Sequence, residues 1–545
     1  SFEDLSGNKF NQEENLIAVN LAETADTTSP AISSCTLNYS TGIMVVTFSE
    51  IVNFDERSVT DGIVAGKLHL ERIFLSNLAR VKDASKGSYY HDRAHNHVQL
   101  AKDDGLHEKA TFVNGNENEG QVVTLQLTEE QRILAESISG VAGGDGSTIL
   151  INFENDTIAD IGGNELVEQC GITVSESPDV IPPVVTTTVQ VDLNDGKLTI
   201  LADETIDVNP TSLLDLSKIH IENMTNDGFI TLTGAQSIST TETTSLTVFL
   251  NEEQRVKAIE KSNTPGGDAT QLFLRVETDA MIDMAGVRND QEFVHVLSEV
   301  ADTTLPTFLS SSINYSTGVL IISMSETIDT TPSSLVVPAQ YSLKHIFGET
   351  YALTGSTPTA FDSTSVTLTL TETLRAQALR MSNMRGGLKG GPGVQLDVAA
   401  AGLQDIAENT NNLQINISVT ENEDIITPTI SSCTIHYGTG EMTITSDETM
   451  RSDLVDVSKI YISNAAGEKA INLAGAEITG PSIYGTPSPT VTIVLTELQR
   501  VAAIAISNTP GGDNTDAVVA DFDAGALKDV GTIPTLDTNG VSVSE

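Results

Sequence analysis

The sequence predicts an all-β protein made of tandem β-sandwich domains, each with one short helix. Three observations lead to this fold class: recurring marker segments, a two-residue alternation of Val, Ile and Thr, and one capped helical segment in each repeat. An opening segment that runs from aspartate to proline begins at Asp26, Asp179, Asp302 and Asp424. The usual interval of about 120 residues is too long for solenoid repeats and matches the commonest size of a whole domain.

We therefore expect four domains, at residues 26–177, 178–300, 301–422 and 423–545. Each closes on a short alternating segment that ends in glutamate, such as 294–299. Residues 1–25 carry the same closing pattern, so we expect them to be the closing strand of a preceding repeat. That strand either belongs to a longer protein, which we favour, or completes a sheet of a neighbouring subunit by strand addition. The first domain also carries an insertion at about 78–119.

Alternating apolar and polar residues predict the strands, for example at 197–202 and 365–370. Successive side chains of a strand point to opposite faces, so this alternation is typical of half-buried strands in antiparallel sheets. Turn signals containing glycine, such as 194–196 and 316–318, separate the strands. Two packed sheets, a β-sandwich, would bury the apolar faces.

A segment of the form Leu-Thr-Glu-x-Gln-Arg predicts one helix in each domain. Each helix should begin after a residue whose side chain can cap free backbone N–H groups, and in three repeats a glutamine three positions later completes a capping box. The capping residues are Thr128, Asn251, Thr371 and Thr496. In the fourth repeat we expect Val501, Ile504 and Ala505 to face the core, and the glycine pair that begins at Gly511 to end the helix. We interpret the segment as purely structural.

The composition excludes several classes of function. The 75 acidic and 28 basic residues give a formal charge of −47, which repels nucleic acid and other polyanions. We expect no transmembrane segment, because no stretch approaches the roughly 20 apolar residues that a spanning helix needs. The motifs of common enzymes are missing, and a chain without Trp lacks the aromatic platforms of a carbohydrate-active enzyme.

The three cysteines are too few for a disulfide scaffold. Cys35 and Cys170 fall in the first and last strands of the first domain, so a disulfide between them is one interpretation and a buried thiol is the other. Cys433 has no partner position and should be free or bonded to another chain. Five sequons offer glycan sites if the source glycosylates them: Asn38, Asn155, Asn223, Asn314 and Asn416.

Acidic residues recur in register and suggest calcium, which takes six to eight oxygen ligands. Each domain has its opening aspartate, a glutamate at the end of an early strand, and an acidic pair before the closing strand. The candidate ligands are Asp26, Glu50, Glu154, Asp160, Asp179, Glu204, Glu277, Asp283, Asp302, Glu326, Asp397, Asp405, Asp424, Glu448, Asp523 and Asp529. The alternative is that these are turn and capping residues bonded to local backbone.

The insertion gathers positive charge and histidine in a chain that is otherwise acidic. His91, Arg93, His95 and His97 are candidates for a contact with acidic residues of a neighbouring subunit. A transition-metal site is a second interpretation, but the spacing fits no standard ligand set. A solvated loop is the third.

The opening segment at 302–306, the Ser-Glu-Thr-Ile bend at 325–328 and the Asp-x-x-Gly-Asn segment at 160–164 resemble the immunoglobulin-like repeats of large bacterial cell-surface proteins. Those are surface-layer, adhesin and flagellum-associated repeat proteins. The resemblance implies extracellular architecture rather than a reaction. We therefore expect an extracellular structural protein, not an enzyme, that self-associates into a filament, surface layer or appendage. The alternative is the stalk of a calcium-stiffened adhesin.

Overall fold

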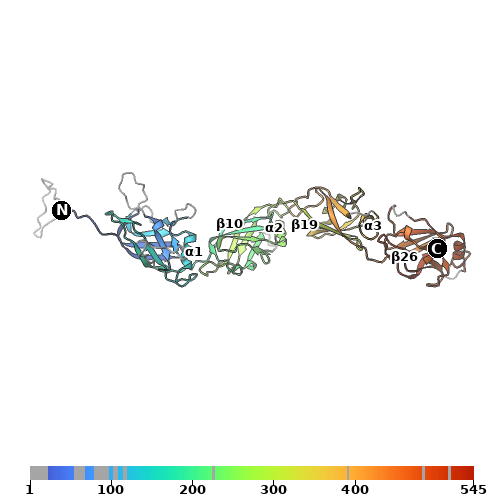
Figure 1. The fold of residues 1–545 in the computed structure, drawn as a ribbon, viewed down its shortest axis with the longest axis horizontal. Helices are drawn as coiled ribbons and strands as arrows, with labels where there is room; N and C mark the ends of the chain where they lie inside the picture. Colours follow the sequence, from blue (N-terminus) through green and yellow to red (C-terminus); the bar gives the residue numbers. More distant parts are fainter. Residues whose placement is uncertain are drawn as a thin grey trace, which may run out of the picture.

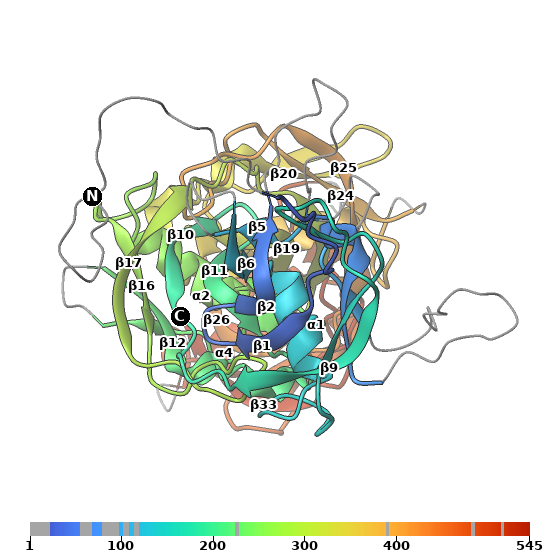
Figure 2. The same cartoon turned by 90° about the vertical axis from the view of Figure 1, so that its left-hand side faces the viewer.

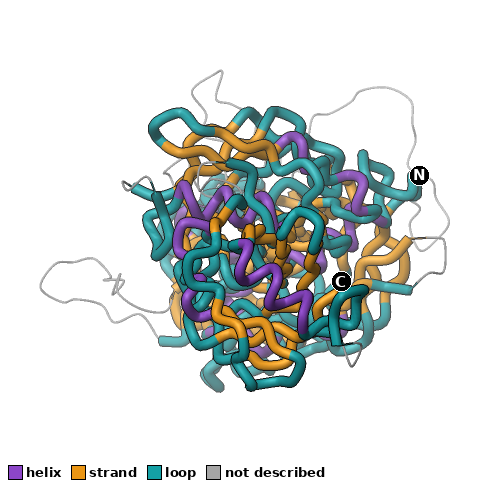
Figure 3. The backbone as a smooth tube through the Cα atoms, turned by 90° about the vertical axis from the view of Figure 1, so that its right-hand side faces the viewer, coloured by secondary structure: helices purple, strands orange, loops and turns teal. Residues whose placement is uncertain are grey.

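Four β-sandwiches follow one another in a row in the computed structural model of the 545-residue chain (Figure 1). The structure describes residues 22–54, 68–78, 97–101, 108–113, 119–223, 228–388, 392–480, 485–513 and 517–545. The views along the row, from either end, show the sandwiches lying behind one another (Figures 2 and 3). The predicted fold class, tandem immunoglobulin-like β-sandwiches with one short helix each, is confirmed.

Sandwich 1 contains β1 Ile32–Asn38, β2 Ile43–Asn53, β3 Ile73–Ser76, β4 His97–Gln99, β5 Thr111–Phe112, β6 Glu119–Gln126, α1 Glu129–Ser137, β7 Leu150–Phe153, β8 Ala159–Asp160 and β9 Gln169–Ser177. Sandwich 2 contains β10 Val185–Asp192, β11 Lys197–Ile206, β12 Ile219–Asn223, β13 Ile230–Thr231, β14 Gln236–Ser237, β15 Thr243–Phe249, α2 Glu252–Glu260, β16 Leu272–Val276 and β17 Glu292–Val300.

Sandwich 3 contains β18 Phe308–Asn314, β19 Val319–Ile328, β20 Tyr341–His345, β21 Thr350–Ala352, β22 Thr357–Pro358, β23 Ser363–Thr369, α3 Glu372–Met381, β24 Val394–Val398 and β25 Gln414–Asn422. Sandwich 4 contains β26 Ile430–His436, β27 Glu441–Ser446, β28 Ile460–Ser463, β29 Ile471–Asn472, β30 Glu477–Ile478, β31 Thr490–Val494, α4 Glu497–Ala505, β32 Val519–Phe522 and β33 Thr538–Ser544.

The closing strand of each sandwich joins its two layers. In sandwich 2 the strand order is β13-β12-β16-β17-β10-β11-β15-β14, and the other sandwiches repeat it, with β8 paired to β2 in addition in sandwich 1. β17 pairs antiparallel with β16 over its first part and parallel with β10 over its last part. The sheet therefore folds over at β17 into two packed layers, and the parallel pairing of first and last strands closes each sandwich.

Each sandwich has its own apolar core, and two of these cores extend into the next sandwich. Inward-facing positions of the strands supply the core, as the alternation predicts; in β11, for example, Leu198 and Ile200 are fully buried. The core of sandwich 2 also includes Ala407 of sandwich 3, and the core of sandwich 3 includes Val530 of sandwich 4. Apolar contact therefore continues across these two boundaries.

The helices begin where the sequence predicts. Thr128, Asn251, Thr371 and Thr496 are the capping residues, and three of the four caps are complete capping boxes. In α2 the Gln254 amide also donates to the carbonyls of Thr231 and Thr233, which fixes the helix to the edge of the sheet. No helix of the described residues is long and apolar enough to cross a membrane.

Two expectations about the helices are wrong. In α4 the buried residues are Gln499 and Ala503, whereas Val501 and Ala505 are exposed, because the helix lies on its glutamine face. The helix ends at Ala505, well before Gly511. The glycine pair closes the following turn instead.

The Cys35–Cys170 disulfide is also wrong. No disulfide joins the three cysteines, all of which the structure describes. Cys35 pairs with Val174 in the parallel β1–β9 ladder. Cys170 lies four residues away along β9, roughly 13 Å at the rise of a strand, whereas bridged Cα atoms lie within about 7 Å. Cys35 and Cys433 are buried, which raises the pKa of each thiol to about 12.

Parts of the other predictions fall outside the described residues. His91, Arg93 and His95 are among these, as is most of the 1–25 segment. His97 is described and lies in β4, so part of the insertion forms a strand equivalent to β13, β21 and β29. Among the sequons, Asn223 is buried and its amide donates to Lys261, Asp268 and Thr270, so a glycan there is incompatible with the fold.

Candidate functional site at the junctions between sandwiches

The arginine of each helical segment reaches across the boundary into the following sandwich. At the junction between sandwiches 2 and 3, Arg255 Nη1 donates to Asp302 Oδ2 at 2.6 Å, and Nη2 donates to Glu326 Oε2 at 3.2 Å. Asp302 lies in the opening segment of sandwich 3 and Glu326 on β19. All three side chains are buried, so a charge-assisted network links the two sandwiches in a desolvated site.

The other two junctions repeat this geometry. Arg132 contacts Asp179 at 2.6 Å and Glu204 at 2.9 Å. The third arginine, Arg375, contacts Asp424 and Glu448 at the same two distances. The repetition shows that the arginine has a constant role in the motif. The interpretation of the segment as a structural helix did not include this contact with the next domain.

Hydrogen bonds within its own sandwich fix the position of each arginine side chain. Arg255 forms two hydrogen bonds with Glu252, at 2.8 and 2.9 Å, and donates to the Leu193 carbonyl at 3.0 Å. Glu252 also crosses the boundary, since its Oε1 accepts the backbone N–H of Thr327 at 2.7 Å. Glu129 and Glu372 make the same contacts with Thr205 and Thr449. The guanidinium is thus fixed on both sides of the junction.

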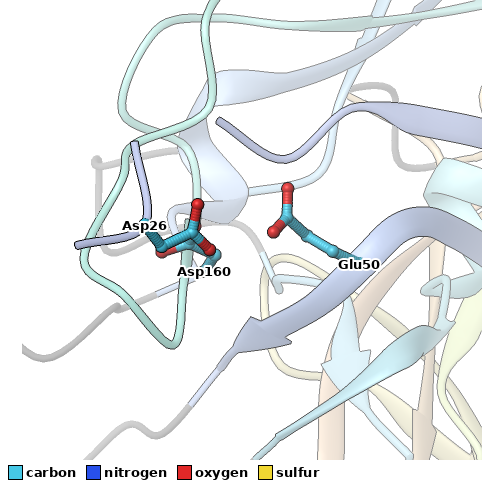
Figure 4. Close-up of side chains that lie close together, drawn as sticks. All are labelled: Asp26, Glu50 and Asp160. Carbon is cyan, nitrogen blue, oxygen red and sulfur yellow. The ribbon is translucent and has the colours of Figure 1, made fainter. Parts of the chain in front are cut away.

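A third acidic residue completes each cluster. It lies in the turn before the closing strand, and a β-bridge brings it beside the end of the glutamate-bearing strand, as for Ile328 with Asp405. One carboxylate oxygen from each member of a triad lies within 4.8 Å of the others. The triads are Asp26/Glu50/Asp160, Asp179/Glu204/Asp283, Asp302/Glu326/Asp405 and Asp424/Glu448/Asp529. The first is shown in Figure 4.

The remaining four candidate ligands lie elsewhere. Glu277 lies near His220 and Arg275, Asp397 pairs with Lys344, and Asp523 with Lys469. Glu154 follows β7, and none of these four belongs to a triad. They precede the turn aspartates by six or eight residues, so they lie in the strand or directly after it, before the turn carries the chain to the junction.

The turn aspartates differ in how many hydrogen bonds their carboxylate oxygens accept. Asn409 donates both its backbone N–H and its side-chain amide to Asp405. In sandwich 2 the equivalent residue is Val287, which donates only its N–H, so Asp283 Oδ2 is buried without a hydrogen bond. Ile533 leaves Asp529 Oδ2 in the same condition.

Burial raises the pKa values of the surplus carboxylates. Desolvation, assisted by neighbouring acids, raises the pKa of Asp283 to about 6 and that of Asp529 to about 7. It also raises the pKa of Glu204 to about 8, against the opposing effect of Arg132. One guanidinium cannot neutralise three buried carboxylates, so part of the cluster favours the protonated form near neutral pH.

The clusters could hold a metal ion, but three of them already hold an organic cation. The guanidinium occupies the oxygens of the opening aspartate and strand glutamate, so an ion would have to bind beside it, at oxygens such as Asp283 Oδ2. Asp26, Glu50 and Asp160 have no ion pair with any other residue that the structure describes. The sequence identified the acidic residues by their register. Their partner could have been found in the same way, because the arginine also recurs at a fixed position in a chain that is otherwise acidic.

Glycine makes the second contact of each junction. A Cβ on Gly266, after α2, would lie 1.9 Å from the Ile406 carbonyl oxygen of the next sandwich, and one on Gly386 would lie 2.1 Å from that of Val530. Gly143 is similarly close to Met284. All three have positive φ, so any other residue would be strained and would separate the sandwiches.

Comparison with known proteins gives a fold-level similarity only. No protein-family model matches the chain, and no curated protein matches it significantly. The FN1–FN3 domains of chicken CNTN1 are 10% identical, cover 72% of this chain and 100% of their own, with a TM-score of 0.17. The surface-layer protein SbsC is 9% identical over 95% of this chain and 54% of its own length, also with a TM-score of 0.17. The four N-terminal Ig domains of Dscam1 are 7% identical over 95% of this chain and 100% of theirs, with a TM-score of 0.13. Such scores mean that whole chains do not superpose, so these likenesses carry no functional argument.

Replacing one junction arginine should loosen one junction. Arg255→Gln leaves Asp302 and Glu326 buried without their cation, which costs about 3 kcal/mol or more at neutral pH. We expect calorimetry to show a lower melting temperature for sandwiches 2 and 3, and small-angle scattering to show a bent or flexible row. Lys257→Gln, on the exposed face of the same helix, should change stability by less than about 0.5 kcal/mol. Equal effects of the two variants would contradict the role of Arg255.

The junctions should also weaken as pH rises. Because the folded-state pKa values of Asp283 and Asp529 exceed the usual value near 4, the folded protein holds protons that the unfolded chain releases. The stability that these two carboxyl groups contribute is therefore fully present below about pH 4 to 5. It is lost as the pH rises through about 6 to 7. Val287→Asn supplies the missing amide donor to Asp283 and should reduce this loss at the first junction. Melting temperatures between pH 5 and pH 8 test the slope, and a rise over that range would contradict it.

Proposed function

We propose that this chain is an extracellular structural protein, a stiff row of immunoglobulin-like sandwiches that assembles into a filament, surface layer or cell appendage. The observation that carries the proposal is the threefold recurrence of the same buried arginine–carboxylate junction. A catalyst needs one distinctive site, whereas the best-defined buried polar groups of this chain align successive domains. We therefore assign it no enzymatic activity.

The physical properties of the junction suit a load-bearing role. A connection made only by a linker lets neighbouring domains move, since interfaces between domains are usually small and polar. Here Arg255, Glu252 and the Gly266 contact fix the distance and the angle together. A formal charge of −47 keeps such rods soluble and prevents indiscriminate association.

An extracellular location agrees with the resemblance of the marker segments to cell-surface repeats and with the acidic surface. Asn38, Asn155 and Asn416 are exposed and Asn314 is half-buried, so these four stay predicted glycan sites. The His97 strand stays a predicted subunit contact. The cell-surface type, the self-association and the glycans are all parts of this proposal.

Electron microscopy of the purified chain tests this function. We expect straight rods in dilute samples and regular polymers or arrays at high concentration. Immunogold labelling of intact source cells should place the protein on the outside. Flexible chains whose domains take random angles, or labelling confined to the cell interior, would contradict the proposal.

The stalk of a calcium-stiffened adhesin is the second candidate. The observation in its favour is the set of buried carboxylate oxygens without a hydrogen bond at the junctions, namely Asp283 Oδ2, Glu326 Oε1 and Asp529 Oδ2. Oxygens of this kind are ligands that calcium prefers, and an ion beside the guanidinium would offset the remaining negative charge.

Calcium should then raise the thermal stability, because an ion that binds only the folded state stabilises it by mass action. We expect the melting temperature at pH 8 to fall in excess EDTA and to recover with calcium. Asp283→Asn and Asp529→Asn together should abolish most of the response, because they remove two of the unpaired oxygens. An identical melting curve with and without the chelator would rule out calcium binding at the junctions and leave arginine as their cation.

A further inference from the structure

The junction between sandwiches 1 and 2, the first junction, differs from the other two at one position of its helix. Four residues after the junction arginine, α2 has Ile259 and α3 has Leu379, whereas α1 has Glu136. Ile259 lies in the apolar cluster that extends to Ala407 of sandwich 3, and Leu379 lies in the cluster that extends to Val530 of sandwich 4. At the first junction a carboxyl group therefore takes the place of an apolar side chain.

Glu136 is buried without a hydrogen-bond partner. Its side chain is 1% exposed, and neither carboxylate oxygen accepts a hydrogen bond. Arg132 Nη1 lies 4.0 Å from Oε2, too far for a hydrogen bond, and this nitrogen already donates to Asp179 at 2.6 Å and to the Tyr39 carbonyl at 3.3 Å. An ionised carboxylate in such a place loses its hydration without compensation, so burial raises the pKa of Glu136 to about 7.

The groups around Glu136 are mostly acidic. They come from α1, from the residue after β1 and from three segments of sandwich 2, namely the opening segment, β11 and the turn before the closing strand. These groups are Glu129, Arg132, Tyr39, Asp179, Glu204 and Asp283. The Tyr39 hydroxyl donates to Glu176 of β9 at 2.9 Å. The Arg132 guanidinium is thus shared among several acids, and the charges of Asp179 and Asp283 oppose the ionisation of Glu136.

The other contacts of the first junction are looser than those of the remaining two. A Cβ on Gly143 would lie 2.5 Å from the Met284 carbonyl oxygen, against 1.9 and 2.1 Å for the equivalent glycines. The apolar core of sandwich 1 includes no described residue of sandwich 2. At the third junction Arg380 donates to the Gly485 carbonyl at 2.9 Å, in addition to the charged network. The first junction therefore depends more than the others on its charged groups.

We propose that the first junction is a proton-operated hinge, which is closed while Glu136 carries a proton and opens when Glu136 ionises. Opening brings water to the carboxylate and moves it away from Asp179 and Asp283, the acids of sandwich 2. The second and third junctions stay closed, because Ile259 and Leu379 cannot ionise. A row that is otherwise stiff thus gains one bending point, a property additional to the proposed function and independent of what the row assembles into.

The direction of the response follows from the two protonation equilibria of Glu136. In the open state the side chain lies in water, where its pKa is near the usual value of about 4.3. The closed state binds the proton more tightly, so its stabilisation is fully present below about pH 4 and is lost as the pH rises through about 7. The ratio of closed to open first junctions should fall on the order of a hundredfold between pH 5 and pH 8. Asp529 titrates in the same direction at the third junction, but the cluster of Leu379 and Val530 keeps that junction closed.

Pulsed electron spin resonance on the complete chain measures the opening, with one label on an exposed position of sandwich 1 and one on sandwich 2. Samples contain EDTA and are compared at pH 5 and pH 8. The unchanged chain should give a narrow distribution of distances at pH 5 and a broad one at pH 8. A second sample, labelled on sandwiches 2 and 3, should give narrow distributions at both pH values, which assigns the response to the first junction.

Three variants test the role of the residue itself. Glu136→Gln keeps the size of the side chain but cannot ionise, and Glu136→Ile gives the first junction the residue of the second. Both should keep the distribution between sandwiches 1 and 2 narrow at pH 8. Glu130→Gln removes the same charge from an exposed position of the same helix and should broaden at pH 8 like the unchanged chain.

Three results would overturn the hinge: a narrow distribution between sandwiches 1 and 2 at both pH values, equal broadening between sandwiches 2 and 3, or broadening at pH 8 that persists in both Glu136 variants. The last result would assign the response to Asp283 instead. None of the three concerns polymer formation, so electron microscopy tests the proposed structural function separately.

Discussion

One guanidinium facing three buried carboxylates at each junction is the constraint on which the rest of the structure depends. Burial of any of these charges alone would be prohibitively costly, so the arginine and the acids are stable only when two sandwiches meet. The arginine comes from the helix of one sandwich, and the acids come from the opening segment, an early strand and a turn of the next. Correct alignment of successive sandwiches is therefore the condition under which the charges are satisfied.

The imbalance within this network has consequences of its own. A cluster with more acids than bases must take up protons or cations, which the raised pKa values of Glu204 and Asp529 express. At the first and third junctions Val287 and Ile533 occupy the position of Asn409. They donate no side-chain hydrogen bond, so one oxygen of the turn aspartate stays buried without a partner. The middle junction, where Asn409 satisfies Asp405, keeps more of its hydrogen bonds. The three junctions are thus built alike but differ in sensitivity to their surroundings.

Local chemistry made much of this fold predictable. The caps at Thr128, Asn251, Thr371 and Thr496 were identified because capping depends on residues that are neighbours in sequence. The strands followed from alternation, and twelve of the sixteen acidic candidates, recognised by their register, lie together in four triads. The other four share the same acidic spacing but lie in a strand or directly after one, and spacing alone does not show where the following turn brings the chain to the junction.

The errors arose where long-range geometry decides. The Cys35–Cys170 pairing failed on a four-residue offset in a parallel ladder, which sequence position does not reveal. The role of Arg255 was missed because its partners lie in the next repeat, at sequence separations of 47 and 71 residues. The glycine pairs were assigned to helix ends, whereas the close approach of the next sandwich is what requires the first glycine of the pairs at 143–144, 266–267 and 386–387.

The central claim is that the buried guanidinium holds neighbouring sandwiches in one orientation. Pulsed electron spin resonance between labels on exposed positions of sandwiches 2 and 3 measures this most directly, as a distribution of distances. A single narrow distribution, centred on the separation in the structure and unchanged by moderate salt, is the predicted result. A broad distribution, typical of domains swinging on a flexible linker, would contradict the account.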